Sequence, residues 1–240
     1  MAVQLRSTRD SAVTQGLKIL VHGPSGAGKT KLCATAPGKP IIISAEAGLL
    51  SLRDVDIPVL EVASISDVHE AYAFLISPEG QVYDWVCIDS ISEIAEVVLN
   101  TEKKLTKDPR QAYGALAEQM TDLVRAFRDL PGRNVYMSCK QDKTKDEQSG
   151  AVLYGPSAPG QRMAQALPYF FDEVFAYRVE KDPEGNTTRW LQTGRDFTHE
   201  AKDRSGALDM FEVPDLAAIA KKIVGTSPKT VAAAVSADVS

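Results

Sequence analysis

Residues 23–30 read Gly23-Pro24-Ser25-Gly26-Ala27-Gly28-Lys29-Thr30 and match every fixed position of the phosphate-binding pattern GxxxxGK[ST]. An apolar run at 17–21 comes before this loop, and a helix-compatible run at 31–34 follows it. The motif needs this strand–loop–helix setting, because its glycines let successive backbone N–H groups converge on an anion at a helix N-terminus. The segment therefore predicts a binding site for a nucleoside triphosphate.

Every residue of the loop is a candidate nucleotide-binding residue, and two of them have defined chemical roles. Lys29 is expected to reach the β- and γ-phosphates, and the Thr30 hydroxyl is expected to ligate Mg²⁺. A second metal candidate is Asp89, which ends the apolar run at 85–88. A carboxylate at a strand tip of the same sheet can hold Mg²⁺ beside Thr30 or through a water.

The chain has 240 residues, 44% of them hydrophobic, which suits one α/β domain with a sizeable core. We expect a flexible arm at 1–16, the domain at 17–224 and a flexible tail at 225–240. The chain has neither a signal-peptide pattern nor an apolar run of membrane-spanning length, so a cytoplasmic protein without membrane contact is expected. The net charge of −5 argues against a globally basic nucleic-acid binder, so any DNA contact requires a local basic patch.

Strand-like and helix-like patterns alternate along the chain. Strands are expected at the apolar runs 41–43, 85–88 and 135–137. Helices are expected at 68–76, 91–99, 116–130 and from Pro214 to about Val224. Such alternation predicts a twisted, mainly parallel sheet with helices on both faces.

Two segments in the second half of the chain depart from this alternation. The runs 174–179 and 189–193 flank a turn-like stretch at 182–186 and predict a C-terminal β-hairpin. The polar segment 141–162 has no clear period and is expected to be a long loop, either functional or disordered.

Glu46 is the candidate general base. It directly follows the strand-like run at 41–45, so it is expected at the same carboxyl edge of the sheet as the phosphate loop. A carboxylate placed there can orient or deprotonate a water molecule for attack on a phosphate.

Three segments resemble elements of RecA-fold ATPases. The run Ile42-Ile43-Ser44-Ala45-Glu46 is similar to the segment that carries their catalytic glutamate, and Val86-Cys87-Ile88-Asp89-Ser90 is similar to their Mg²⁺ strand. The stretch Ala201-Lys202-Asp203-Arg204-Ser205-Gly206 resembles their KxR element, whose two cations reach the γ-phosphate of a neighbouring subunit. On an extended segment, Lys202 and Arg204 point the same way and can approach one polyanion. The resemblance thus implies a site shared between subunits.

With Tyr113-Gly114 and the loop at 155–160, these segments resemble phage-encoded RecA-like ATP-binding proteins of the single-strand annealing and recombination class, over roughly Leu17 to Val224. The resemblance implies a RecA-like P-loop NTPase fold with ATP and Mg²⁺ as cofactors. It also implies slow, DNA-responsive ATP hydrolysis, binding of single-stranded DNA and strand annealing by a homo-oligomer, a ring or a filament. A single-strand DNA-binding protein is a further expected partner, and the host cytoplasm is the expected location.

The γ-phosphate sensor has two candidates. The expected strand at 134–139 ends in Lys140-Gln141, where RecA-like proteins place a polar sensor, commonly Gln, and the phage family often His. Gln141 would sense phosphate by a hydrogen bond, whereas Lys140 would contribute a charge. Both stay candidates.

In the RecA fold, two mobile loops touch DNA. One comes after the helix that follows the Mg²⁺ strand, and the other comes after the sensor strand. The corresponding segments in this chain are 101–111 and 141–162. Their candidate DNA-binding residues are Lys103, Lys104, Lys107, Arg110, Lys143, Lys145, Tyr154 and Arg162. Stacked subunits would repeat the cations along a phosphate backbone, and Tyr154 could stack on a base.

Three alternatives share the phosphate loop. A GTP-binding switch protein is opposed by Cys139, which stands where a guanine-reading element needs an amide, and by the missing glycine after Asp89. A small-molecule or nucleotide kinase normally carries an arginine-rich lid, for which Arg125, Arg128 and Arg133 are the remaining candidates. The third alternative is an assembly module that binds ATP with negligible turnover.

Overall fold

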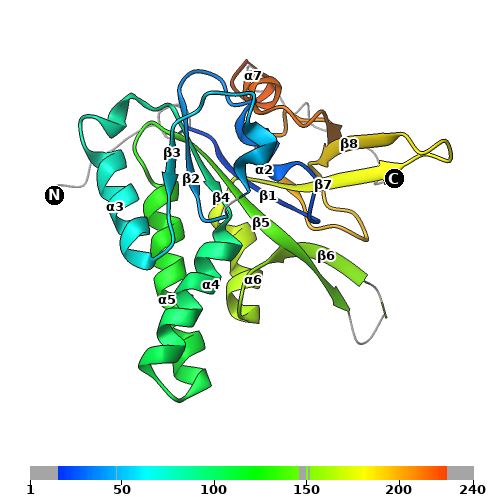
Figure 1. Ribbon diagram of the computed structural model, residues 1–240. Helices are drawn as coiled ribbons and strands as arrows, with labels where there is room; N and C mark the ends of the chain where they lie inside the picture. The colour runs from blue at the N-terminus through cyan, green and yellow to red at the C-terminus, as the bar shows by residue number, and fades with distance from the viewer. Residues whose placement is uncertain (1–15, 47, 146–149, 151, 226–240) are drawn as a thin grey trace, which may run out of the picture.

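A mixed β-sheet forms the centre of the protein (Figure 1). The computed structural model describes residues 16–46, 48–145, 150 and 152–225. Within these residues the strands lie in the order β10-β8-β7-β1-β5-β4-β2-β3, with β6 paired to β5 and β9 to β7. The strands are β1 Lys18–Gly23, β2 Pro40–Ser44, β3 Val59–Glu61, β4 Trp85–Asp89, β5 Asn134–Lys145, β6 Val152–Ser157, β7 Glu173–Lys181, β8 Thr187–Gln192, β9 Lys202–Asp203 and β10 Phe211–Glu212.

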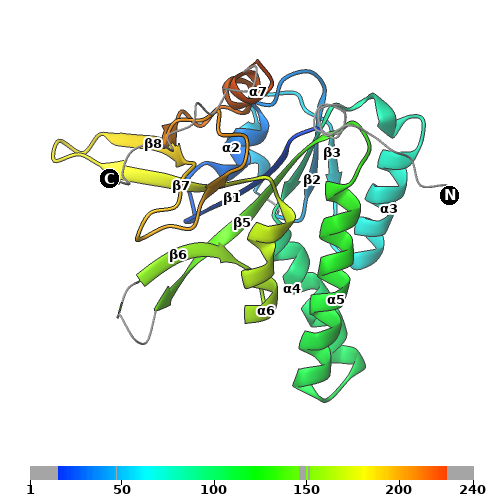
Figure 2. The same ribbon diagram turned by 180° about the vertical axis from the view of Figure 1, so that it is seen from behind.

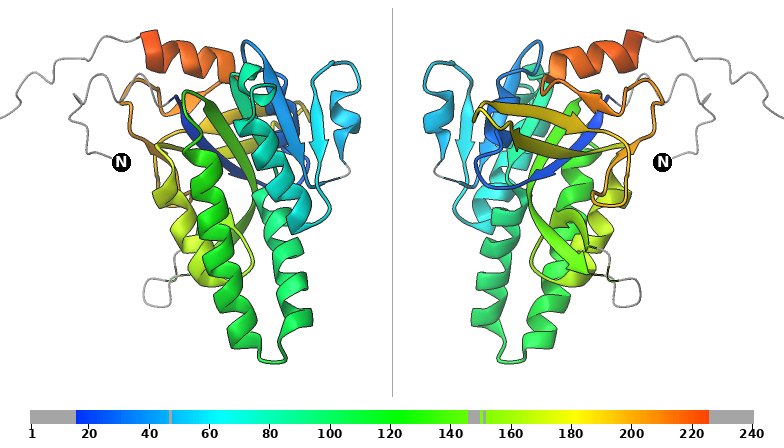
Figure 3. Two further views of the ribbon diagram at one scale, coloured as in Figure 1. Left: turned by 90° about the vertical axis from the view of Figure 1, so that its left-hand side faces the viewer. Right: turned by 90° about the vertical axis from the view of Figure 1, so that its right-hand side faces the viewer.

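Helices cover both faces of this sheet, as Figures 2 and 3 show. The helices are α2 Lys29–Cys33, α3 Ile65–Ile76, α4 Ile91–Leu105, α5 Pro109–Arg128, α6 Gln161–Ala166 and α7 Leu216–Gly225, with 3₁₀ turns η1 Leu49–Leu52, η2 Gly80–Val82 and η3 Leu167–Phe170. On one face, α3 to α6 bury side chains such as Ile41 and Ile43. On the other face, α2 and α7 cover Ile42, because successive strand residues point to opposite sides.

In the spatial order β7-β1-β5-β4-β2-β3, all neighbouring strands pair in parallel, and β5 lies between β1 and β4. Parallel pairing brings the carboxyl ends of β1, β2 and β4 to one edge, where Ser44 lies opposite Asp89 and Gly23 lies opposite Lys140 in the middle of β5. The strands β7 and β8 form an antiparallel hairpin. The predicted parallel sheet, the two helical layers and the C-terminal hairpin are confirmed.

The predicted loop at 141–162 is a different structure. Residues 140–145 of β5 pair antiparallel with residues 152–157 of β6, and the polar hairpin projects from the sheet. The residues of its β5 strand are mostly exposed and those of β6 are mostly half-buried, so no buried apolar alternation marks it as a pair of strands. Backbone pairing between the two strands decides its conformation. Helix α6 then follows at Gln161.

The predicted loop at 101–111 is mostly helical. Helix α4 continues to Leu105 and α5 begins at Pro109 behind the N-cap Asp108, so only a short turn joins them. The two helices form a hairpin that extends past the sheet (Figure 3). None of the described helices is long and apolar enough to cross a membrane. The expected arm at 1–16 and tail at 225–240 lie almost wholly outside the described residues.

Candidate nucleotide site

A pocket of about 740 Å³ opens at the carboxyl edge of the sheet, around the end of β1. The whole phosphate loop lines it. The other predicted site residues that line it are Glu46, Asp89, Lys140 and Gln141. The fold therefore brings together groups that come from four different strands or strand ends.

The phosphate loop has the backbone shape that its glycines allow. Gly26 and Gly28 have φ values of 73° and 118°, in the region that favours glycine. The Tyr177 hydroxyl lies 2.8 Å from the position that a Cβ on Gly28 would occupy, so a side chain there would also collide with Tyr177. Sterics and backbone conformation together require glycine at position 28.

The ammonium of Lys29 lies on the loop itself. Its Nζ donates to the carbonyls of Gly23 and Pro24, at 2.8 and 2.9 Å. Burial lowers the pKa of Lys29 below its ordinary value, while nearby Asp89 and Glu46 act in the opposite direction. A phosphate oxygen at the loop would replace two neutral carbonyls with an anionic acceptor, which is the stronger kind of hydrogen bond.

The hydroxyl of Thr30 donates to the Oδ2 atom of Asp89 at 2.5 Å, which joins α2 to the end of β4. The other oxygen, Oδ1, accepts a hydrogen bond from Ser138 on β5. Hydroxyl and carboxylate oxygens are the ligands that Mg²⁺ prefers, so this pair fits the ion expected at the site. Bound there, Mg²⁺ would neutralise phosphate charge, and Thr30 and Asp89 would hold it.

The Ser138 contact was not anticipated from the sequence, and it carries a stability prediction. Asp89 is 3% exposed and Ser138 is fully buried. In Ser138→Ala, one carboxylate oxygen loses its donor in a buried setting. We expect the free energy of unfolding to fall by about 1.5–3 kcal/mol. Denaturant unfolding measures the change, and an unchanged midpoint would show that this hydrogen bond contributes nothing.

Glu46 lies where a base is needed, two residues beyond β2. Its Oε1 accepts a hydrogen bond from the Ser90 hydroxyl at 2.8 Å, and the Ser44 hydroxyl donates to its backbone carbonyl at 2.6 Å. Ser90 follows Asp89 directly and is also the N-cap of α4. The metal candidate and the support of the base are thus consecutive residues at one strand end.

Both sensor candidates reach the pocket, but they are held differently. The ammonium of Lys140 forms an ion pair with Glu93, which raises the pKa of Lys140. Gln141 instead contacts the imidazole of His22, with 3.2 Å between Oε1 and Nδ1. The charge of Lys140 is therefore already paired, whereas Gln141 lies against a neutral ring.

Sequence comparison places the chain in a family. The AAA domain family AAA_24 matches residues 15–205. This chain is a member of the AAA domain family. A search of curated proteins finds no match. Among solved structures, a KaiC-like protein of the hyperthermophilic archaeon Pyrococcus horikoshii is similar, with 13% identity over 79% of this chain and 87% of that chain and a TM-score of 0.43.

The family and the phosphate loop together make this AAA domain a P-loop NTPase, a nucleotide-binding protein of the ATPase class. Its mainly parallel sheet with helices on both faces is the P-loop NTPase α/β fold that was expected.

Two of the other residues that line the pocket of the AAA domain lie against the phosphate loop and were missed in the sequence. Tyr177 on β7 and Arg189 on β8 both face the loop, and Arg189 Nε donates to the Ala27 carbonyl at 3.1 Å. They belong to the predicted hairpin, whose alternation identifies strands but does not show which element the hairpin packs against. Only the pairing of β7 with β1 places them beside the nucleotide pocket.

Lys202 and Arg204 do not line the pocket. Lys202 Nζ donates to the carbonyls of Pro168 and Phe171, both at 2.6 Å, and Arg204 pairs with Asp172 at 3.1 Å. Both residues line a second cavity of about 890 Å³ between the β5–β6 hairpin and α6. The subunit itself therefore already uses Lys202 as a structural link.

Proposed function

We propose that this protein is a Mg²⁺-dependent ATPase that binds single-stranded DNA as a homo-oligomer and promotes strand annealing in recombination. The observation that carries the proposal is the pair Asp89-Ser90. Asp89 contacts Thr30 of the phosphate loop, and Ser90 holds Glu46 at the same pocket. One strand end thereby connects the metal candidate and the candidate base.

The proposed reaction is hydrolysis of the terminal phosphate. Glu46 takes a proton from water while the water oxygen forms a bond to the γ-phosphorus. The bond from this phosphorus to the bridging oxygen breaks, and ADP leaves. Lys29 and the loop N–H groups stabilise the charge on the phosphates. Ser90 orients Glu46 through one carboxylate oxygen, so that the other oxygen can accept the proton.

Two of the three alternatives lose support in the fold. Cys139, which stands where a guanine-reading amide is needed, is fully buried within β5. The three arginines considered for a kinase lid lie elsewhere. Arg133 donates to the carbonyls of Gly80 and Leu75, Arg128 pairs with Asp129, and Arg125 lies over the Phe170 ring. None of the three lines the nucleotide pocket.

Two projections carry the candidate DNA-binding cations. Lys103, Lys104, Lys107 and Arg110 lie around the tip of the α4–α5 hairpin, and Lys143 and Lys145 lie near the end of the β5–β6 hairpin. A ring or filament would repeat both projections, and weak phosphate contacts would then add by avidity.

Tyr154 is less suited to base stacking than expected, because His199 already stacks on its ring, with 5.0 Å between the ring centroids. Arg162 lines a separate cavity beside α5.

The decisive experiment measures ATP hydrolysis with and without single-stranded DNA and examines the particles by electron microscopy. We expect stimulation by DNA and ATP-dependent rings or filaments. A paired variant, Lys143→Ala with Lys145→Ala, should lose the stimulation and keep the basal rate. Turnover that responds to a small phosphate acceptor instead would indicate a kinase. Nucleotide binding without any turnover would indicate an assembly module. We further propose that a single-strand DNA-binding protein is a partner of this protein. The proposed location is the cytoplasm of a phage-infected host.

Arg204 provides the test of a shared site. Its side chain is 59% exposed, so it can reach a neighbouring subunit more readily than Lys202. In Arg204→Ala we expect ATP hydrolysis to fall about 10³- to 10⁵-fold with nucleotide affinity unchanged. Mixing this variant with Lys29→Ala subunits should restore part of the activity, because each partner supplies the group that the other lacks.

The control for Arg204 is Arg53→Ala, an exposed arginine paired only with its neighbour Asp54 among the described contacts. It should leave hydrolysis unchanged. If mixed subunits show no recovery, Arg204 acts within its own subunit.

A further inference from the structure

His22, the last residue before the phosphate loop, is buried and polar. It lies on β1 between Cys139 of β5 and Ala176 of β7, and it has no exposed surface. Burial is the main reason that the pKa of His22 falls to about 4. The imidazole is therefore neutral at physiological pH and carries a single N–H.

The contacts of the ring determine which nitrogen carries that hydrogen. Nε2 lies 2.6 Å from the backbone carbonyl of Glu200, which can only accept a hydrogen bond. Nε2 therefore donates, and Nδ1 is an acceptor. The carboxamide of Gln141 lies 3.2 Å from Nδ1 and must present an N–H there, because its two ends are interchangeable in shape and only their hydrogen bonds assign them. The amide oxygen is then turned away from the ring.

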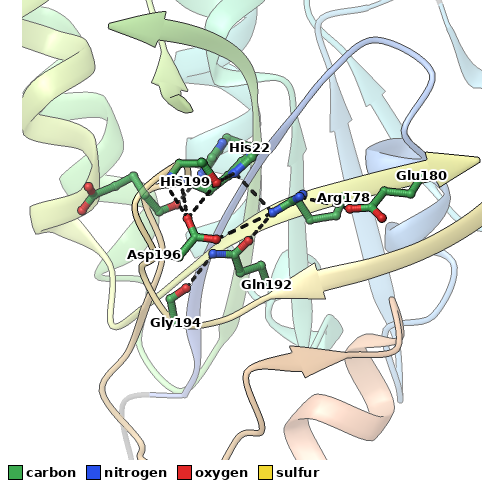
Figure 4. Close-up of polar contacts among 9 residues, drawn as sticks. His22, Arg178, Glu180, Gln192, Gly194, Asp196 and His199 are labelled. Atoms are coloured by element: carbon green, nitrogen blue, oxygen red, sulfur yellow. Dashed lines mark hydrogen bonds and ion pairs between the residues drawn. The ribbon is translucent and has the colours of Figure 1, made fainter. Parts of the chain in front are cut away.

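A polar cluster formed by Arg178 of β7, Gln192 of β8 and the chain after β8 fixes the segment that carries the Glu200 carbonyl (Figure 4). Asp196 Oδ1 accepts hydrogen bonds from the backbone N–H groups of Thr198 and His199, both at 2.7 Å. Arg178 donates to Gln192 at 2.6 Å and lies 3.3 Å from the His199 ring.

The β5–β6 hairpin holds the same segment from the other side. The Glu200 N–H donates to the Tyr154 carbonyl at 2.8 Å, and the Tyr154 N–H donates to the Thr198 carbonyl at 2.7 Å. The carbonyl that binds His22 therefore has little freedom to move.

We propose that His22 is a positioning residue that holds the Gln141 carboxamide with its N–H toward the ring and its oxygen available to the nucleotide pocket. In this orientation Gln141 accepts a hydrogen bond from the attacking water and acts beside Glu46. This role rests on the proposed ATPase function. It also joins the nucleotide pocket to the segment at 196–204, which carries Lys202 and Arg204, through the single imidazole of His22.

The orientation can be tested without any turnover. Proton–nitrogen NMR of the wild-type protein, with His22 assigned from the spectrum of His22→Phe, distinguishes a protonated ring nitrogen from an unprotonated one. We expect a hydrogen on Nε2 and none on Nδ1 at neutral pH. A hydrogen on Nδ1 would overturn the proposed orientation, whatever the protein does with ATP.

A matched pair of variants tests the role in hydrolysis. The variant His22→Asn retains a hydrogen-bond acceptor near the position of Nδ1. The variant His22→Gln retains only a hydrogen-bond donor near the position of Nε2. We expect His22→Gln to lower kcat about 10- to 100-fold with KM unchanged, since a misplaced water costs rate and not affinity. His22→Asn should recover most of kcat.

A double-mutant cycle separates positioning from a structural role. If His22 acts through Gln141, His22→Gln should add no further loss in a Gln141→Ala background. Additive losses, or equal losses of kcat and nucleotide affinity, would make His22 merely structural. Wild-type protein without ATP hydrolysis would contradict the proposed function instead, and the NMR result would still decide the orientation.

Discussion

Glu46→Gln should bind ATP with wild-type affinity and hydrolyse it about 10²- to 10⁴-fold more slowly. The substitution keeps an oxygen that can accept from Ser90 Oγ, so the 2.8 Å contact and the loop geometry are preserved. It removes only the ability to take a proton. A fall in kcat without a change in nucleotide affinity is therefore the signature of a lost base and not of a distorted pocket.

Single-turnover hydrolysis and an independent nucleotide titration measure the two quantities separately. The control is Glu61→Gln, at the end of the neighbouring strand β3 but outside the pocket lining. Its kcat should equal that of the wild type. If Glu46→Gln turns over at the wild-type rate, another group must activate the water, and the assignment of Glu46 is wrong.

Lys29→Ala should lose ATP affinity by about ten- to a hundredfold. A charge-assisted contact to phosphate contributes on the order of 1.5–3 kcal/mol, and no other loop side chain carries a positive charge. The folded state should tolerate the change, because the hydrogen bond of Lys29 to Pro24 is exposed and the one to Gly23 is only partly buried, so water can replace the ammonium. Calorimetric titration with a non-hydrolysable ATP analogue measures the effect.

Lys39→Ala is the matched control for Lys29, because it removes an exposed lysine that lies before β2 and outside the pocket. Its affinity for the analogue should be unchanged. Unchanged affinity in Lys29→Ala as well would contradict the assignment of residues 23–30 as the triphosphate site.

Much of the candidate site could be predicted because it depends on local pattern and on one rule of topology. The loop is a continuous motif, and its glycines are required by backbone conformation. Asp89 and Glu46 follow apolar runs, and parallel strands place their carboxyl ends at one edge. No tertiary contact was needed to identify these residues as candidates.

The remaining features come from contacts between distant segments. Ser138 meets Asp89 across 49 residues of sequence, and His22 meets Glu200 across 178. The β5–β6 hairpin lacks an apolar period, so its pairing could not be recognised in the pattern. The spacing of Lys202 and Arg204 is that of a pair of phosphate-binding cations. The hydrogen bonds of Lys202 Nζ to the carbonyls of Pro168 and Phe171 form only in the folded chain, where β9 lies close to η3.

The amino-acid order alone determined the phosphate loop, the alternating strands and helices and the carboxyl-edge position of Asp89 and Glu46. Such features follow from backbone conformation and from the repeat of apolar residues along a few turns or strands. Tertiary structure decided which side chains support them, Ser138, Ser90, Tyr177, Arg189 and His22. A buried polar group must find its partner wherever the folded chain places one, and sequence distance does not limit that choice.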